Sequence, residues 1–231
     1  MRATDGTTVI RRLLVLLLVS SCLIAGTAGA ATRKPTDPQK RLNPADQAWA
    51  AAIRIHRGDL GGGDWRVEQS QDNVAAPQGC QDPDLSDLVE TGEAENPDFS
   101  RNGSFVGSGA AVFLTTKQAT AAFQRVARQS FNRCMVSAFK QGLAGSGARL
   151  RILSSGPIAM KSLAPHFVSG RVRFSVAGPA ATVTGRISFY FLARDRATAM
   201  LFVASIGKPL QPISASLESR LASLVAARLH R

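Results

Sequence analysis

The second half of the chain alternates apolar and polar residues with a period of two, which is the pattern of β-strands that bury one face. Turn-forming sequences at Gly156-Pro157, Gly178-Pro179 and Arg194-Asp195-Arg196 divide it into four segments. We therefore predict an antiparallel meander of four strands. Its large apolar positions are Leu150/Ile152, Val172/Phe174/Val176, Val183/Ile187/Phe189/Phe191 and Met200/Phe202/Ala204/Ile206.

Three other segments have apolar residues every three or four positions, which predicts amphipathic helices. The first begins after Asn43, the second runs from about Lys117 to Leu143, and the third begins near Pro212. Thr115 and Gln118 are expected to form a capping box at the start of the second helix. The predicted buried faces are Ala45, Trp49, Ala52, Ile53 and His56 in the first helix, a stripe from Phe123 to Phe139 that includes Cys134 in the second, and Ile213, Leu217, Leu221, Leu224, Val225 and Leu229 in the third.

Two further strands are expected, from Trp65 to Glu68 and from Val106 to Leu114. Residues 69–104 lack periodicity and contain three prolines, so they are predicted to form a long irregular excursion. The order α-β-β-α-β-β-β-β-α defines an α+β fold, with an antiparallel sheet of about five or six strands packed against three helices. We place this fold in one domain, residues 43–231, and expect residues 31–42 to be a flexible linker.

The chain begins with the features of a secretory signal peptide. Arg2, Arg11 and Arg12 precede an apolar run, and Ala28-Gly29-Ala30 supplies the small residues of a cleavage site, so residues 1–30 are expected to be removed. An alternative remains open, because Val19-Ser20-Ser21-Cys22 fits a bacterial lipobox in which Cys22 is lipidated. In both cases the mature protein is expected outside the cytoplasm, either secreted or lipid-anchored to the outer face of the cytoplasmic membrane.

Export determines how the cysteines are interpreted. Cys80 and Cys134 remain once Cys22 is removed or lipidated, and two cysteines in an oxidising compartment are expected to form one disulfide. The bond would hold the 69–104 excursion beneath the second helix. The alternative, a free catalytic thiol, needs an activating histidine, and residues 57–165 contain none.

Charge is distributed unevenly along the chain. The formal net charge is +12, yet residues 31–98 carry 13 acidic residues against 7 Lys and Arg. Residues 99–231 carry 18 Lys and Arg and only two acidic residues, Asp195 and Glu218. A cationic partner is therefore not expected for the basic part of the chain.

The strand alternation places several basic side chains on one face of the predicted meander, because residues of one phase share a sheet face. One interpretation is a site for an anionic ligand: an envelope polymer, a lipid or a small molecule. The other is a solvated face that the acidic segment 82–98 partly neutralises. In the first case Arg171 and Arg173 are expected to face solvent. The residues of this phase are Arg149, Arg151, Arg171, Arg173, Arg186 and Tyr190.

No sequence motif for catalysis, cofactor binding or metal binding is complete. No serine has the glycine neighbours of a nucleophile elbow, and Asp82, Asp84 and Asp87 lack the glycine and distal glutamate of a calcium loop. We therefore predict no catalytic residue, no cofactor and no metal. In the alternative of an enzyme of unrecognised type, His166 is the candidate base. A nucleic-acid partner is not expected, because only Tyr190 accompanies the arginines.

The segment from the first helix to the last resembles a family of actinobacterial exported domains of unknown function, which are distantly similar to the extracellular sensor domains of mycobacterial Ser/Thr kinases and to related lipoproteins. The resemblance covers roughly residues 44–230 and implies an α+β fold around an antiparallel sheet with a cleft, and a ligand-sensing role. It carries over no catalytic residue, and this chain has no kinase or transmembrane segment and one expected disulfide where the kinase sensors have two. The matching residues are Asp59-Leu60, Asp64-Trp65, Cys80, Asp84-Leu85-Ser86-Asp87-Leu88, Thr91-Gly92-Glu93-Ala94, Phe99, Ser108, Val112-Phe113, Ala119, Ala122-Phe123 and Cys134.

These observations predict an exported, non-enzymatic binding or sensor-type domain of the cell envelope. The alternatives are an enzyme of unrecognised type and a structural envelope protein.

Overall fold

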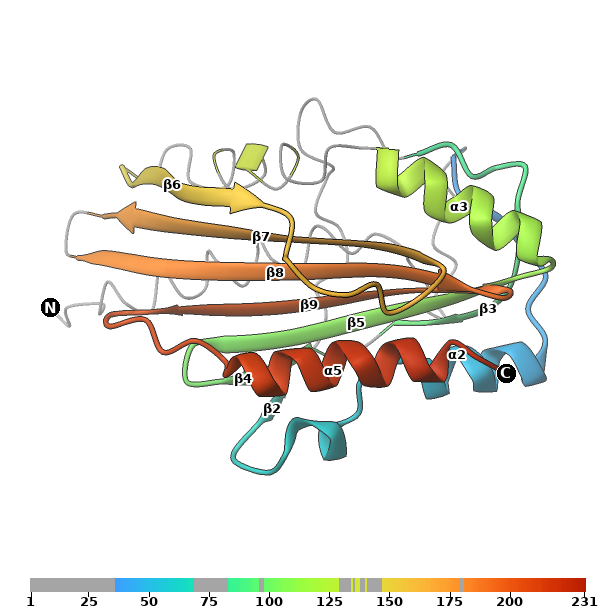
Figure 1. The fold of residues 1–231 in the computed structure, drawn as a ribbon, viewed down its shortest axis with the longest axis horizontal. Helices are drawn as coiled ribbons and strands as arrows, with labels where there is room; N and C mark the ends of the chain where they lie inside the picture. The colour runs from blue at the N-terminus through green and yellow to red at the C-terminus, as the bar shows by residue number, and fades with distance from the viewer. Residues whose placement is uncertain are drawn as a thin grey trace, which may run out of the picture.

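One large sheet with helices on both faces forms the described part of the molecule (Figure 1). The computed structural model describes residues 36–68, 83–95, 98–128, 147–178 and 181–231, together with Cys134, Val136, Ser137 and Lys140. The strands are β1 (Gln39–Lys40), β2 (Arg66–Glu68), β3 (Val89–Ala94), β4 (Asp98–Arg101), β5 (Ser104–Phe113), β6 (Arg149–Gly156), β7 (His166–Ala177), β8 (Thr182–Arg194) and β9 (Ala197–Gly207). The main path through the sheet is β1-β3-β5-β9-β8-β7-β6, while β4 pairs with β5 and β2 pairs with β4.

The predicted meander is confirmed as β6, β7, β8 and β9, each antiparallel to the next. On β7 the period of two corresponds to one buried and one exposed face, since Val172 and Phe174 are fully buried while Arg173 between them is exposed. The predicted strands at Trp65–Glu68 and Val106–Leu114 are also present, as β2 and β5.

The predicted strand count and order are wrong for the first half of the chain. Two strands, β3 and β4, lie within the segment 69–104 that was expected to be irregular, and Gln39–Lys40 of the expected linker pairs with β3 in parallel. The sheet is therefore mixed, and the described residues alone supply nine strands instead of five or six antiparallel ones. The sequence of β3 lacks the alternation of apolar and polar residues that predicts a strand. Glu90 is buried on this strand, and Gly92 lies against the backbone of Asp46, where an added Cβ would approach within 2.3 Å.

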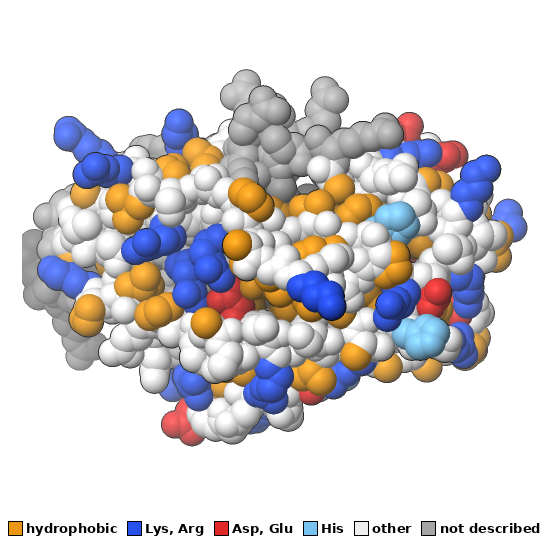
Figure 2. Space-filling view, in the orientation of Figure 1, with side chains coloured by type: hydrophobic (Ala, Val, Ile, Leu, Met, Phe, Trp, Pro, Cys, Tyr) orange, Lys and Arg blue, Asp and Glu red, His pale blue; other side chains and the backbone are white. Residues whose placement is uncertain are grey.

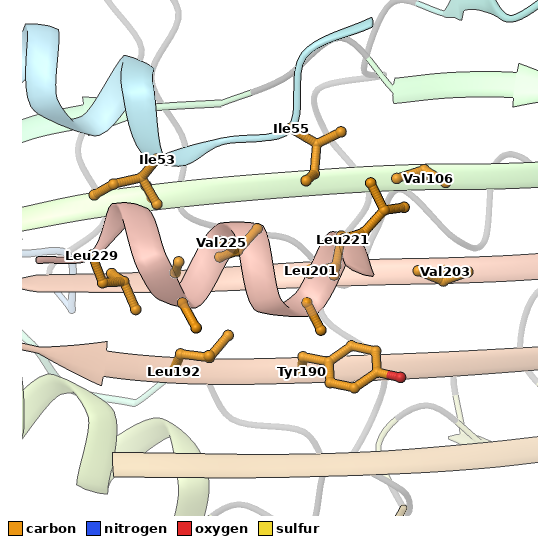
Figure 3. Packing of buried hydrophobic residues seen from close by; sticks show 14 of the residues in the cluster. Ile53, Ile55, Val106, Tyr190, Leu192, Leu201, Val203, Leu221, Val225 and Leu229 are labelled. Atoms are coloured by element: carbon orange, nitrogen blue, oxygen red, sulfur yellow. The ribbon is translucent and has the colours of Figure 1, made fainter. Parts of the chain in front are cut away.

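Within the described part of the chain, three α-helices cover the sheet, as predicted: α2 (Pro44–Ile53), α3 (Thr116–Arg128) and α5 (Ala215–Arg228), with a 3₁₀ turn, η1 (Arg57–Leu60). The helices α2 and α5 pack on one face, where Leu221 and Val225 of α5, and Leu229 directly after it, lie over Leu192 and Leu201 of the sheet (Figure 3). On the opposite face, α3 packs through Phe123 against Phe191 and Ala193. The helix α5 therefore covers the meander on the face that carries its polar side chains, including the predicted arginines.

Details at the helix starts differ from the expectations. Thr115 Oγ1 accepts a hydrogen bond from the Gln118 backbone N–H at 3.2 Å, but the Gln118 side chain instead accepts from the Val89 N–H at 3.3 Å, so the capping box is only half formed. In α2 the buried face is rotated toward Asp46 and Ala50. The expected face members Ala45, Ala52 and His56 are exposed.

Several expectations concern residues beyond those that the structure describes. The expected signal peptide, Cys22 and Cys80 lie outside the described residues, as do most positions of the second predicted helix after Arg128. Cys134 is disulfide-bonded, and its pairing with Cys80 stays a prediction. Among the described helices, none is long and apolar enough to cross a membrane.

Candidate functional site

The register of the meander brings the predicted arginines together on the face that α5 partly covers. Arg173 of β7 lies directly opposite Arg186 of β8, and Arg171 lies opposite Ser188. On β6, Arg151 is opposite Ser175, which shares the phase of Arg173, so a β-bulge between Ile152 and Ser154 does not move the β6 arginines to the other face. We call Arg149, Arg151, Arg171, Arg173 and Arg186 the arginine face.

One buried carboxylate, Glu218 of α5, binds the inner part of the arginine face. Its side chain is 2% exposed. Its Oε1 accepts hydrogen bonds from Arg171 at 2.7 Å and from the Tyr190 hydroxyl at 2.6 Å, and its Oε2 accepts one from Arg186 at 3.0 Å. Arg171 also donates to Ser188 Oγ at 2.9 Å, and Arg186 donates to the backbone oxygen of Ile213, just before α5, at 2.7 Å.

The electrostatics of this network follow from its burial. Burial would raise the pKa of Glu218, but hydrogen bonds, led by that from Tyr190, outweigh burial and hold the pKa below its ordinary value. Burial lowers the pKa of Arg186, with neighbouring Arg171 and Arg173 acting in the same direction. Two guanidinium groups thus share one carboxylate, which leaves the inner part of the face with a net positive charge.

The outer part of the arginine face is exposed. Arg149, Arg151 and Arg173 are solvent-exposed, and among the described residues no carboxylate lies within ion-pair distance of them. Figure 2 shows basic side chains gathered over this part of the sheet, with acidic atoms at their border. The expectation that these side chains face solvent is therefore right for Arg173 and wrong for Arg171, which the ion pair with Glu218 holds half-buried.

The acidic segment does not neutralise the arginine face through its described residues. Asp87 pairs with Arg125 of α3, and Glu93 pairs with Lys40 of β1 at 2.6 Å. These carboxylates belong to β3 and the turn before it, at the end of the strand order opposite to β6. The carboxylate that partly neutralises the arginine face is therefore Glu218, and not a described residue of the acidic segment 82–98.

The other two candidate residues, His166 and Tyr190, contact other side chains of the protein. His166 lies under α3, where its Nε2 is 3.4 Å from Thr120 Oγ1 and its ring is 5.6 Å from that of Phe123. Tyr190 is 2% exposed, so its hydroxyl reaches Glu218 and not the solvent. The described residues contain no group of three His, Cys, Asp or Glu that could hold a metal ion.

Glu218 is the residue of this site that sequence reasoning missed. Its position was visible in one respect, since it is one of only two acidic residues after position 98. It also has helical spacing to Leu221 and Val225, so it lies on the apolar face of the last helix. A lone carboxylate on the buried face of a helix, beside a sheet with an arginine phase, indicates a buried ion pair.

Comparison with known proteins gives no assignment: no protein-family model and no curated protein matches the sequence. The fold and the arginine face therefore define the molecule as an α+β domain with a basic sheet face.

Proposed function

We propose that the protein is an exported, non-enzymatic binding domain of the cell envelope whose arginine face holds an anionic ligand. The location is supported by two expectations from the sequence, the N-terminal signal peptide and the resemblance to extracellular sensor domains. The main support for the ligand class is the exposed set of Arg149, Arg151 and Arg173, which have no carboxylate partner among the described residues.

The face combines a fixed part with a free part. Arg171 and Arg186 are held by Glu218 and by the backbone before α5, so the sheet and the helix stay in place while a ligand binds. The outer arginines keep their hydrogen-bonding capacity, and a guanidinium group binds phosphate or carboxylate through two parallel N–H donors. An anion at this surface would form charge-assisted hydrogen bonds without displacing a protein carboxylate.

Charge reversal at the outer arginines tests the proposal. The double variant Arg149→Glu, Arg173→Glu is expected to weaken binding to a soluble anionic polymer at least tenfold, which is about 1.4 kcal/mol, because two attractive contacts become repulsive. Binding is measured by fluorescence anisotropy with labelled poly(glycerol phosphate) and labelled polygalacturonate.

The matched control is Arg57→Glu, Arg66→Glu, which makes the same change in net charge at two exposed positions outside the face. It is expected to bind nearly as well as the unmodified protein, and both variants should keep its melting temperature. An equal loss in both variants would show that only net charge matters, and no loss in the first would show that the arginine face is not the site.

A further inference from the structure

Glu218 shows how the arginine face accommodates an anion. Two arginines on adjacent strands, Arg171 and Arg186, converge on its single carboxylate, at 2.7 Å and 3.0 Å. Glu218 therefore occupies the inner end of the face as a built-in anion. The outer arginines extend the same pattern toward the edge strand β6, without a carboxylate of their own among the described residues.

The register arranges these arginines in a row. Arg149 and Arg151 are two residues apart on β6, which is about 6.8 Å along the strand. Arg173 is on the neighbouring strand and one two-residue step further along, because Arg151 is opposite Ser175. At about 4.8 Å between strands, this step is roughly 8 Å. The row Arg149–Arg151–Arg173 thus has a nearly constant spacing and ends at the pair that Glu218 holds.

We propose that the ligand of this face is a linear polyanion that lies along the row and places successive negative charges near Arg149, Arg151 and Arg173. This inference rests on the proposed anion-binding function and narrows its ligand. A single compact anion would leave part of the row unpaired, because the ends of the row are about 14 Å apart. A chain with charges at regular intervals pairs with all three arginines and continues the pattern that Glu218 begins.

The surroundings of the row favour a chain over a flat membrane. The helix α5 stands above the sheet on one side, anchored by Leu221 and Val225. The connection between β6 and β7 crosses the same face, and its residues Ile158, Met160 and Leu163 pack against the same core (Figure 1). A flexible chain can follow arginines that lie beside these raised elements, whereas a planar bilayer surface meets the raised elements first.

A length series tests the proposal. Glycerol-phosphate oligomers of one to six phosphates, and galacturonate oligomers of the same lengths, are titrated against the protein by isothermal calorimetry at several salt concentrations. Affinity is expected to rise steeply up to about three charges and then to level off. For three neutralised charges the logarithm of affinity should fall with the logarithm of salt concentration with a slope of about −2, at roughly 0.7 per charge.

Single neutral variants provide the controls. Arg149→Gln, Arg151→Gln and Arg173→Gln are each expected to reduce the slope by about 0.7, whereas Arg57→Gln, at an exposed position outside the face, should leave it unchanged. Melting temperatures confirm that each variant is folded. A length effect with only one of the two oligomer types would support the row and identify phosphate or carboxylate as its charge.

Three results would overturn the linear ligand. If the affinity per charge is the same for oligomers of every length, the face binds anions but the spacing of the three arginines does not select a chain. Binding to vesicles containing phosphatidylglycerol but not to any oligomer would show a membrane surface instead. Absence of binding to every anion, polymers included, would overturn the proposed function itself together with this inference.

Discussion

Among single residues, Glu218 links the sheet to α5 through three side chains. Removing it leaves Arg171 and Arg186 with an unbalanced charge and Tyr190 without its acceptor. Breaking a buried ion pair by deleting one partner commonly costs about 3–5 kcal/mol. Because Arg171 keeps 34% of its side-chain exposure, we expect Glu218→Gln to cost about 3 kcal/mol in the free energy of unfolding, at the lower end of that range.

Urea unfolding of Glu218→Gln and of Arg173→Gln side by side measures this difference. The Arg173 variant is expected to stay within about 0.5 kcal/mol of the unmodified protein, because it removes an exposed side chain. Comparable stability of the two variants would mean that the Glu218 network does not hold α5 on the sheet.

A second carboxyl group, Glu90 on β3, is buried without a partner. Its side chain is 0% exposed and both oxygens lack a hydrogen bond. Burial, assisted by nearby Glu93, raises the pKa of Glu90 to about 8 from an ordinary value of 4.5, although Lys40 acts in the opposite direction. The folded protein therefore keeps a proton here that the unfolded chain loses above pH 4.5.

This proton makes stability depend on pH with a definite sign. The unfolded state binds fewer protons than the folded state between about pH 4.5 and 8, so the stability falls as pH rises through that range. Between pH 6.5 and 8 we expect a loss of about 1 kcal/mol per pH unit, and Glu90→Gln should flatten this slope in urea titrations. Asp98→Asn is the control, because burial raises the pKa of Asp98 only to about 6, below this window. A slope unchanged in Glu90→Gln would refute the assignment.

At the scale of elements, the strands that bury one face could be predicted from the sequence. Strands β6 and β7 alternate clearly, because one side packs in the core while Arg149, Arg151 and Arg173 remain in solvent. Strands β8 and β9 are buried on both faces over most of their length. Strand β3 does not alternate, since its first four residues, including Glu90, are buried. Gly92 leaves room there for the backbone of α2, a tertiary contact that no local pattern reports.

The hairpin of β4 and β5 could have been predicted from the sequence of its turn. Asn102-Gly103 joins β4 to β5 with φ angles of 48° and 78°, the conformation that makes Asn-Gly the preferred two-residue hairpin turn. The arginine face could be predicted from strand phase alone. Its division into a bound and a free part could not, because that depends on where α5 crosses the sheet.

At the scale of the whole molecule, the charge asymmetry of the sequence becomes a spatial one. The acidic side chains of β3 and of the turn before it pair with Lys40 and Arg125, near one end of the strand order. The exposed arginines lie on β6 and β7, at the other end. An anionic partner is therefore attracted toward the unpaired cations of β6 and β7 more strongly than toward β3, where the cations are already paired.

A nuclear magnetic resonance titration of the arginine Nε–H signals shows whether Arg149, Arg151 and Arg173 bind an anion together. With a glycerol-phosphate oligomer of four units, we expect the signals of these three residues to shift in concert with a single dissociation constant. Arg54 and Arg57, which lie beside α2 and in η1, should not shift. Shifts spread evenly over all exposed arginines, or confined to arginines outside the face, would contradict this expectation.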